Sequence, residues 1–300
     1  MTKKKLMIRA EANEVVAMGH MKRMLSIGQA ARDLGMEVLF VCAEEKALAM
    51  PEEEGFRSLC LERDWTDTEG EIPVMQNLLC VERPDRMIVD GYFFTEEYVR
   101  RMEEKVPVAY MDDLYERIWP CSYLINYGIS AQDYPYESKY PEKTRLLLGC
   151  KYMPIAKEYR DLNKKEITDV KQVLVVTGGN DEARFMTGFL KHLKEESESL
   201  KELSYRLICG RFHPQKDELM RLADELKDIC TVTVEESLPS LKEAMISADI
   251  AVTAGGTTLY ELAACGTPGV CVCIADNQKP NIKGFTEKNL LWYGGDVRDA

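Results

Sequence analysis

The stretch Asp249-Ile-Ala-Val-Thr-Ala-Gly-Gly-Thr-Thr-Leu-Tyr-Glu-Leu-Ala-Ala264 decides the fold of this 300-residue chain. The apolar run Ile250 to Ala254 predicts a buried strand, and two glycines follow it. Thr257 or Thr258 is then a natural N-cap for a helix that carries its leucines on one face. Strand, glycine turn and helix in this order predict a parallel α/β sheet.

The same turn is a candidate nucleotide site. The first backbone N–H groups of a helix have no partner within the helix, and the helix dipole places positive charge there, so the position favours phosphate. Glu261 lies one turn inside the helix, where it is placed to accept hydrogen bonds from sugar hydroxyls. The pattern therefore predicts a nucleotide held by its diphosphate and its ribose.

A second apolar run, Gly269 to Ala275, ends at Asp276-Asn277-Gln278. Asn277 and Gln278 offer amides without charge directly after a predicted strand, where ligands of parallel sheets bind. Uncharged amides suit a neutral sugar.

Composition narrows the classes of protein. The length suits two domains of about 150 residues. Lys and Arg total 39 against 51 Asp and Glu, for a net charge of -12, so we expect no nucleic-acid partner. The run Lys3-Lys4-Lys5 is interpreted as a solvated segment.

No apolar segment approaches the roughly 18 residues of a membrane span, and the early charges Arg9 and Glu11 argue against a secretory leader. Ten cysteines occur without a C-x-x-C pair, several of them inside apolar runs, and the three histidines are scattered. We therefore expect reduced core cysteines, no structural metal, no cofactor and a cytoplasmic location.

Strand-like and helix-like segments alternate in both halves, which predicts parallel sheets covered by helices. We predict an N-terminal Rossmann-like domain over 1–150, a C-terminal one over 151–300 and a linker at about 152–169, with ligands bound in a cleft between them. The predicted strands are Leu6–Arg9, Val38–Cys42, Phe56–Leu61, Arg86–Asp90, Val106–Met111, Tyr123–Asn126, Gln172–Thr177, Tyr205–Cys209, Thr231–Val234, Asp249–Thr253 and Gly269–Ile274.

His20 is the candidate catalytic residue. It follows Gly19, which allows a sharp backbone turn, at the start of a helix with apolar residues at helical spacing and Gly35 as its C′ residue. A helix N-terminus disfavours imidazolium, so we expect a lowered pKa and a neutral histidine, as a general base requires. A capping or packing role is the alternative.

Other polar residues also follow predicted strands. Gly178-Gly179-Asn180 is a second candidate ligand turn, although an isolated glycine pair is also typical of ordinary turns. Tyr92, after Asp90-Gly91, is placed to bind a sugar or the attacking water. Asp112-Asp113 has two interpretations, ligand binding or helix capping. No G-x-G-x-x-G or P-loop sequence occurs, which argues against a dehydrogenase or an ordinary NTPase.

Taken together, these segments resemble the UDP-sugar hydrolases of the pseudaminic-acid pathway, the PseG family, also known as SpsG-type proteins. The resemblance spans nearly the whole chain and rests on the order of its segments. These are Arg9-Ala10-Glu11, Gly19-His20-Met21-Lys22-Arg23, Val89-Asp90-Gly91-Tyr92, Met111-Asp112-Asp113, Leu148-Gly149-Cys150-Lys151-Tyr152, Thr177-Gly178-Gly179-Asn180-Asp181, Ala254–Glu261 and Asn277-Gln278.

The resemblance implies a GT-B architecture like that of the MurG glycosyltransferases. It also implies hydrolysis of UDP-2,4-diacetamido-2,4,6-trideoxy-β-L-altropyranose with inversion, releasing UDP and the free sugar. By this resemblance His20 activates water, Gly255, Gly256 and Thr257 hold the diphosphate, Glu261 the ribose, and Asn277 with Gln278 the sugar. Arg9, Gly19, Tyr92, Gly178, Gly179 and Asn180 complete the predicted substrate contacts.

The chain departs from the family pattern at three places, of which the first two, Glu11 and Ala17, lie in the loop beside the sugar and bear on the exact sugar more than on the reaction. Glu11 stands where the family usually has Asp, Ala17 replaces the first glycine of G-x-G-H, and members usually continue beyond the position of Ala300. Two further functions stay open: a GT-B glycosyltransferase that passes the sugar of a UDP-sugar to an acceptor, and a sugar-nucleotide-binding protein without turnover. The sequence does not decide the oligomeric state.

Overall fold

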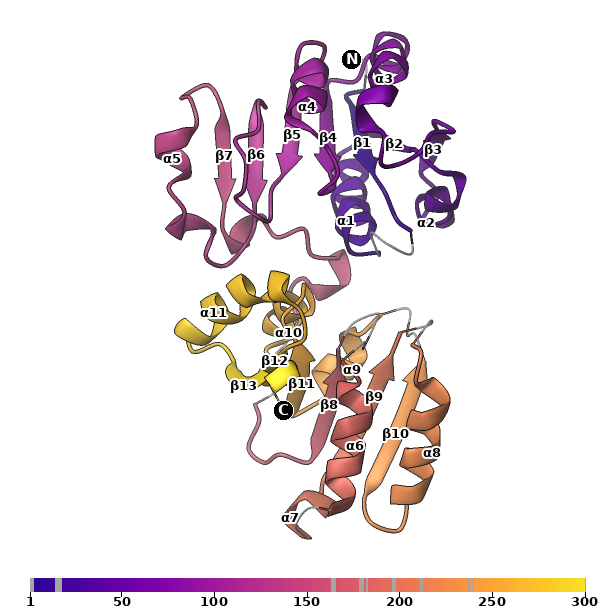
Figure 1. Cartoon of the computed structure of the whole chain (residues 1–300), viewed down its shortest axis with the longest axis vertical. Helices are drawn as coiled ribbons and strands as arrows, with labels where there is room; N and C mark the ends of the chain where they lie inside the picture. Colours follow the sequence, from indigo (N-terminus) through magenta and orange to yellow (C-terminus); the bar gives the residue numbers. More distant parts are fainter. Residues whose placement is uncertain are drawn as a thin grey trace. The chain divides into compact units, whose positions relative to one another are not determined.

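The computed structural model describes residues 3–13, 18–162, 166–177, 181, 183–195, 198–210, 213–236, 238 and 240–299. The chain divides into two compact units, Met1–Lys157 and Glu158–Ala300. Figure 1 colours them along the sequence, and each unit is described by itself. The division falls inside the predicted linker, whose Asn163, Lys164 and Lys165 lie outside the described residues.

The first unit contains a seven-stranded sheet in the order β3-β2-β1-β4-β5-β6-β7, and every neighbouring pair is parallel. Parallel strands need crossover connections, which the helices of the unit supply in part. The strands are β1 (Lys5–Ala10), β2 (Glu37–Cys42), β3 (Arg57–Cys60), β4 (Arg86–Asp90), β5 (Val108–Met111), β6 (Tyr123–Asn126) and β7 (Arg145–Leu148), and the helices are α1 (Gly19–Asp33), α2 (Ala49–Glu53), α3 (Thr68–Glu82), α4 (Glu96–Glu103) and α5 (Tyr136–Lys139).

Helices cover both faces of this sheet because alternate strand residues point to opposite sides. Met7 and Val41 join a core cluster with residues of α3 and α4. Phe40, one position away from Val41, lies against α1, where a Cβ on Gly28 would be 3.1 Å from the Phe40 ring. The helix therefore approaches the sheet closely at Gly28. Met21 and Met24 of the same helix are fully buried.

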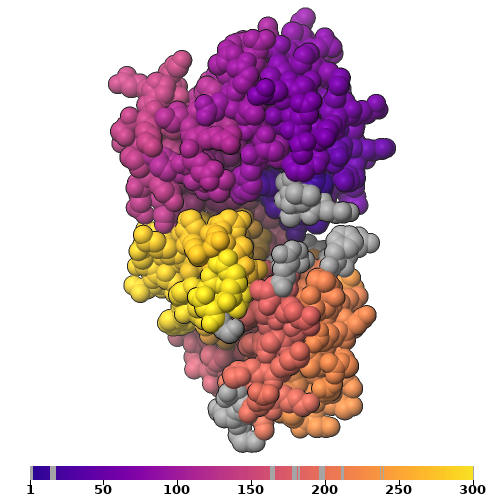
Figure 2. Space-filling model, in the orientation of Figure 1, coloured from indigo at the N-terminus to yellow at the C-terminus, as the bar shows by residue number. Residues whose placement is uncertain are grey.

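The second unit contains a six-stranded sheet in the order β10-β9-β8-β11-β12-β13, again parallel throughout. Its core includes buried residues of β8, β9, α6 and α8, and the residues from α11 onward gather on one face of the unit (Figure 2, yellow). The strands are β8 (Gln172–Val176), β9 (Ser204–Cys209), β10 (Thr231–Glu236), β11 (Ile250–Ala254), β12 (Gly269–Cys273) and β13 (Trp292–Asp296), and the helices are α6 (Phe185–Glu195), α7 (Glu198–Lys201), α8 (Lys216–Leu226), α9 (Lys242–Ser247), α10 (Thr258–Cys265) and α11 (Lys279–Glu287).

The structure confirms the predicted parallel α/β class and adds two edge strands that the sequence pattern did not indicate. β7 is only four residues long. β13 reads Trp-Tyr-Gly-Gly-Asp, and its pairing with β12 shifts register between Cys271 and Cys273. Edge strands pack on fewer neighbours and tolerate glycine, so their sequences carry a weak strand pattern.

Candidate active site

His20 is the second residue of α1, and its side chain is buried. Gly19 begins the helix without a left-handed φ, and a Cβ there would meet nothing within 4 Å. The backbone at Gly19 therefore does not require glycine, and the space beside it is open. The loop that precedes it includes Ala17, which lies outside the described residues.

Asp90 contacts the ring of His20. It is the last residue of β4, which pairs with β1, and its Oδ1 lies 2.7 Å from Nδ1 of His20. Burial alone would raise the pKa of Asp90, but Arg23 and His20 outweigh it and lower that pKa to about 2. An ionised carboxylate only accepts, so this contact favours a proton on Nδ1, and in the neutral ring Nε2 then has the lone pair. Nη2 of Arg23 also lies 3.0 Å from Nδ1 and shares the Asp90 oxygen with it. The Asp90 contact, which the helix-dipole argument did not include, selects the tautomer that a base at Nε2 requires.

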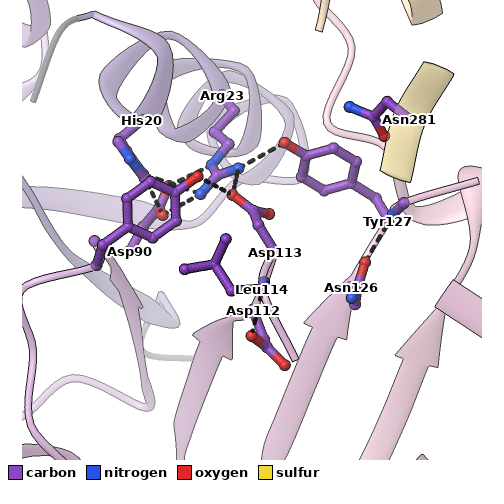
Figure 3. Close-up of polar contacts among 12 residues, drawn as sticks. His20, Arg23, Asp90, Asp112, Asp113, Leu114, Asn126, Tyr127 and Asn281 are labelled. Atoms are coloured by element: carbon purple, nitrogen blue, oxygen red, sulfur yellow. Dashed lines mark hydrogen bonds and ion pairs between the residues drawn. The ribbon is translucent and has the colours of Figure 1, made fainter. Parts of the chain in front are cut away.

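Arg23 holds this arrangement together from one turn further along α1 (Figure 3). Its Nε lies 2.6 Å from Oδ2 of Asp90, and its Nη2 donates to Oδ1 of the same carboxylate. Nη1 donates to Oδ2 of Asp113 at 2.7 Å and to the hydroxyl of Tyr127 at 2.6 Å. A single buried guanidinium thus fixes two carboxylates, as its planar fork of donors allows.

Tyr92 completes the group on the side of Asp113. Its hydroxyl donates to Oδ2 of Asp113 at 2.9 Å, and its ring meets the His20 ring edge-on with centroids 4.7 Å apart. Partial burial and the Asp113 carboxylate raise the pKa of Tyr92, so the phenol stays protonated. About half of this side chain is exposed (49%), which leaves it accessible beside His20.

The structure does not support Arg9 as a substrate-binding residue. Its side chain is fully buried and makes two hydrogen bonds to Glu71, from Nε at 2.9 Å and from Nη2 at 2.8 Å. Nη1 donates to Oε1 of Glu11, which also accepts from the backbone N–H of Ala43. Arg9 therefore anchors the chain after β1 and has no surface with which to reach a ligand.

In the second unit, Gly255 follows β11 and contacts α11. A Cβ on Gly255 would lie 2.5 Å from Cγ1 of Ile282 and 2.9 Å from Cβ of Gln278. Its N–H donates to Oε1 of Gln278 at 3.2 Å, and the same oxygen accepts from the N–H of Ile274 at 3.2 Å. Gln278 thus links the ends of β11 and β12, and the Gly255 N–H and the Gln278 oxygen already have protein partners. Their predicted contacts to phosphate and sugar stay predictions.

Gly256 and Thr257 are better placed for a ligand. A Cβ on Gly256 would meet nothing within 4 Å, and Thr257 is the N-cap of α10 with an exposed side chain that makes no capping hydrogen bond. The predicted helix start is confirmed, and its first turn contains Glu261, which is half-buried. Asn277 is exposed in the short turn before α11.

The remaining predicted residues are the Gly178 turn and the pair Asp112 and Asp113. Gly178, Gly179 and Asn180 lie outside the described residues. Asp112 caps a turn, because its Oδ1 accepts from the N–H groups of Leu114 and Tyr115 and its Oδ2 accepts from the Tyr136 hydroxyl. Asp113 instead faces Arg23, and the two neighbouring carboxylates point to different sides (Figure 3).

None of the ten cysteines forms a disulfide, and seven of them are buried. Within the described ranges, no group of three or more His, Cys, Asp or Glu side chains is arranged to hold a metal ion. The same ranges contain no helix with both the length and the apolar character to cross a membrane.

The sequence prediction of the site missed Arg23 and the partnership of Asp90 and Asp113 with it. Two signals were present. Arg23 is three residues after His20, so both lie on one helix face. Asp90 ends the strand beside β1, so its carboxylate reaches the same sheet edge as the start of α1.

Comparison with known proteins agrees with this architecture. Residues 173–293 match the Glycosyltransferase family 28 C-terminal domain. MurG of Acinetobacter baumannii superposes with a TM-score of 0.70 at 12% identity, over 100% of this chain and 87% of that one. The fold is GT-B. A putative UDP-N-acetylglucosamine 2-epimerase of Listeria monocytogenes also has this fold, with a TM-score of 0.63 at 12% identity over 100% of this chain and 86% of its own.

A curated relative is an uncharacterized protein of Methanocaldococcus jannaschii, 20% identical over 95% of this chain. The chain spans 58% of that protein's length. These similarities define the GT-B fold and the C-terminal domain match, and they leave the reaction to be argued from the site.

Proposed function

We propose that this GT-B protein cleaves the anomeric C–O bond of a UDP-sugar, with His20 as general base. The observation that carries the proposal is the His20 and Asp90 pair at 2.7 Å. Asp90 keeps the proton on Nδ1, so Nε2 can take a proton from an attacking hydroxyl, and the imidazolium that forms is stabilised by the carboxylate. Tyr92, beside the ring, is placed to orient the attacking group.

The second unit supplies the nucleotide site in this proposal. Gly256 and Thr257 at the start of α10 offer backbone N–H groups and the positive end of the helix dipole to the diphosphate. The same charge stabilises the negative charge that grows on the departing UDP. Glu261 accepts hydrogen bonds from the ribose, and Asn277 with the amide group of Gln278 faces the sugar. Uridine is proposed because of the UDP-N-acetylglucosamine named for the Listeria protein and the PseG resemblance.

We favour transfer of the sugar to an acceptor alcohol. The match over residues 173–293 is to a glycosyltransferase domain, and a glycosyltransferase, MurG, is among the structures that share the fold. The base then takes the acceptor's proton as the acceptor oxygen bonds to the anomeric carbon, while the bond to UDP breaks. Attack from the side opposite UDP inverts the configuration.

Hydrolysis of the PseG type is the second candidate. It uses the same residues with water in place of the acceptor, and the order of segments along the chain, from Arg9-Ala10-Glu11 to Asn277-Gln278, favours it. On this proposal the products are UDP and a free 2,4-diacetamido-2,4,6-trideoxy-L-altrose.

Product analysis separates the two reactions. UDP-linked acetamido sugars are incubated with the protein, with and without a panel of acceptor alcohols, and UDP and free sugar are quantified. Release of UDP only with an acceptor supports transfer, and stoichiometric free sugar without an acceptor supports hydrolysis. Tight UDP binding without any product over hours would contradict both and indicate a binding protein.

A further inference from the structure

Asp113 in the first unit has one carboxylate oxygen available to a ligand (Figure 3). Its Oδ2 accepts hydrogen bonds from Nη1 of Arg23 at 2.7 Å and from the hydroxyl of Tyr92 at 2.9 Å. Within the described part of the chain, Oδ1 accepts no hydrogen bond, and the side chain is 19% exposed. Because two donors fix the carboxylate through Oδ2, the direction of Oδ1 is set before a ligand binds.

The side chain of Tyr92 connects Asp113 to the candidate base. Its ring meets the ring of His20 with centroids 4.7 Å apart, and its hydroxyl donates to Asp113. One six-membered ring with its hydroxyl therefore contacts both residues, and half of this side chain is exposed. A hexose is also a six-membered ring that carries hydroxyls, so a hexose lying against Tyr92 can reach both His20 and Asp113.

A small hollow in the surface lies beside Asp113. The residues that line it include Tyr92, Leu114 and Glu116, and its volume is about 30 Å³. One water needs about 10–15 Å³, so the hollow holds roughly two water-sized groups. It therefore admits a hydroxyl group and is too small for a sugar ring. The ring of a ligand has to stay outside, against the exposed part of Tyr92, with a hydroxyl directed inward.

The charges around the hollow restrict the ligand further. Its wall includes the carboxylates of Asp113 and Glu116 and one guanidinium, that of Arg117. The guanidinium of Arg23 is already bound to Asp90 and Asp113. The excess of negative charge favours a group that donates a hydrogen bond and repels a carboxylate or phosphate. The ligand group that fits is therefore a hydroxyl without a negative charge beside it.

We propose that Oδ1 of Asp113 binds a hydroxyl group of the sugar that reacts at His20, and that Asp113 and Glu116 together exclude sugars with a negative charge. The inference rests on the proposed function, in which both transfer and hydrolysis bring the anomeric carbon of the UDP-sugar to the group that His20 activates. Asp113 is then a specificity-determining residue. The substrate class is narrowed to UDP-linked neutral sugars that carry a free hydroxyl.

A binding measurement tests this proposal without depending on turnover. Calorimetry compares UDP, two neutral sugars (UDP-glucose and UDP-N-acetylglucosamine) and one anionic sugar, UDP-glucuronate. The protein is expected to bind the neutral sugars about 10-fold more tightly than UDP-glucuronate, because like charges placed together oppose binding. Equal affinity for neutral and anionic sugars would overturn the proposal. If none of the four ligands binds, the proposed function itself fails, and this inference fails with it.

Asp113→Asn gives the sharper readout, because its two expected effects have opposite signs. The amide keeps the shape and loses the charge, so affinity for the neutral sugars should fall by about 5- to 20-fold. UDP-glucuronate should bind about 5- to 10-fold more tightly, and UDP should bind as before. General damage to the first unit would not strengthen the binding of any sugar. An unchanged ratio of neutral to anionic affinity would overturn the proposal.

Two further variants complete the test. Glu116→Gln removes a charge from the wall of the hollow without touching Arg23, so it should raise UDP-glucuronate affinity by about 2- to 5-fold and leave the neutral sugars unchanged. This variant decides the proposal if Asp113→Asn does not fold, and no gain for UDP-glucuronate would overturn it. The matched control is Asp133→Asn, at an exposed aspartate of the same unit, which should change no affinity. The same effects in Asp133→Asn as in Asp113→Asn would contradict a local contact.

Discussion

The two candidate sites, one in each unit, are formed by different kinds of chemical group. The His20 end of the first unit consists of charged side chains that fix one another, with Arg23 donating to both Asp90 and Asp113. The Gly255 end of the second unit consists of backbone groups, two glycines and an amide side chain. Ionisable side chains can accept and donate protons during a reaction. Backbone N–H groups bind an anion through hydrogen bonds and do not change their protonation. On the proposed function, the His20 site therefore transfers the proton and the Gly256 site binds the diphosphate.

Replacement of His20 is expected to have the largest effect, because it should lower turnover without changing UDP affinity. His20→Ala is expected to lower kcat by about 10²–10⁴-fold, as loss of a general base does, and to leave UDP affinity near its original value. Steady-state UDP release and calorimetric UDP binding measure the two quantities. His192→Ala, on the exposed side of α6, is the control. Full activity in His20→Ala would remove this residue from the mechanism.

A substitution at Gly256 should instead lower UDP affinity. Gly256→Asp adds a carboxylate where a Cβ has open space, so the fold should persist while the diphosphate is repelled. We expect UDP affinity to fall by about 10- to 100-fold, the size of typical coupling between close charges. Gly188→Asp, at another open glycine on α6, should bind UDP normally. Unchanged affinity in Gly256→Asp would place the diphosphate elsewhere.

Acid should weaken the His20 site through Asp90. The folded pKa of Asp90 is about 2, below the usual 3.9 of an unfolded Asp, so its ionisation stabilises the fold above about pH 4. This contribution, about 2–3 kcal/mol, is lost as the pH falls from about 4 to about 2. Asp90→Asn should therefore destabilise the first unit at pH 7 and matter little near pH 2.

Amide hydrogen exchange in β1 and β4, measured as a function of urea concentration, reports the stability of the first unit specifically. The penalty of a Gly255→Ala variant in the second unit, which arises from packing, is expected to be the same at both pH values. If the Asp90→Asn penalty is also independent of pH, the carboxylate is not ionised in the way inferred above.

The smallest effect distinguishes the two adjacent glycines. Gly255→Ala forces its Cβ against Ile282, and overpacking costs about 1–3 kcal/mol, with the lower end expected because the tip of Ile282 can move. Gly256→Ala should change the free energy of unfolding by less than about 0.5 kcal/mol. The double variant Gly255→Ala, Ile282→Ala should recover part of the loss. Equal effects at both glycines would show that packing against α11 does not require Gly255.

The sequence predicted the parallel α/β class and most strands, because apolar runs of four to six residues between turn residues are a strong local signal. It placed the N-cap of α10 at Thr257 or Thr258, and the structure has it at Thr257. It could not assign the partner of Gly255, since that contact depends on Ile282 and Gln278, which are 27 and 23 residues further along the chain. The burial of Arg9 also depends on a distant residue, Glu71.

The pattern identified His20 but not its environment, for the same reason. Asp90 is 70 residues away and Asp113 is 90 residues from Arg23. Their meeting follows from strand order, in which β4 and β5 lie beside β1 on one side. From the sequence, only the dipole of the helix could be considered as an influence on His20. The order of the strands brings the carboxylate of Asp90 to the same ring.

The guanidinium nitrogens of Arg23 connect a group of side chains that should respond together to substitution. Its members are His20, Asp90, Asp113 and Tyr127. Removing any one member disturbs the guanidinium that holds the others, so a second removal adds little to the first. Arg23→Lys would keep the charge yet lose the fork, and should therefore resemble a deletion more than a conservative change.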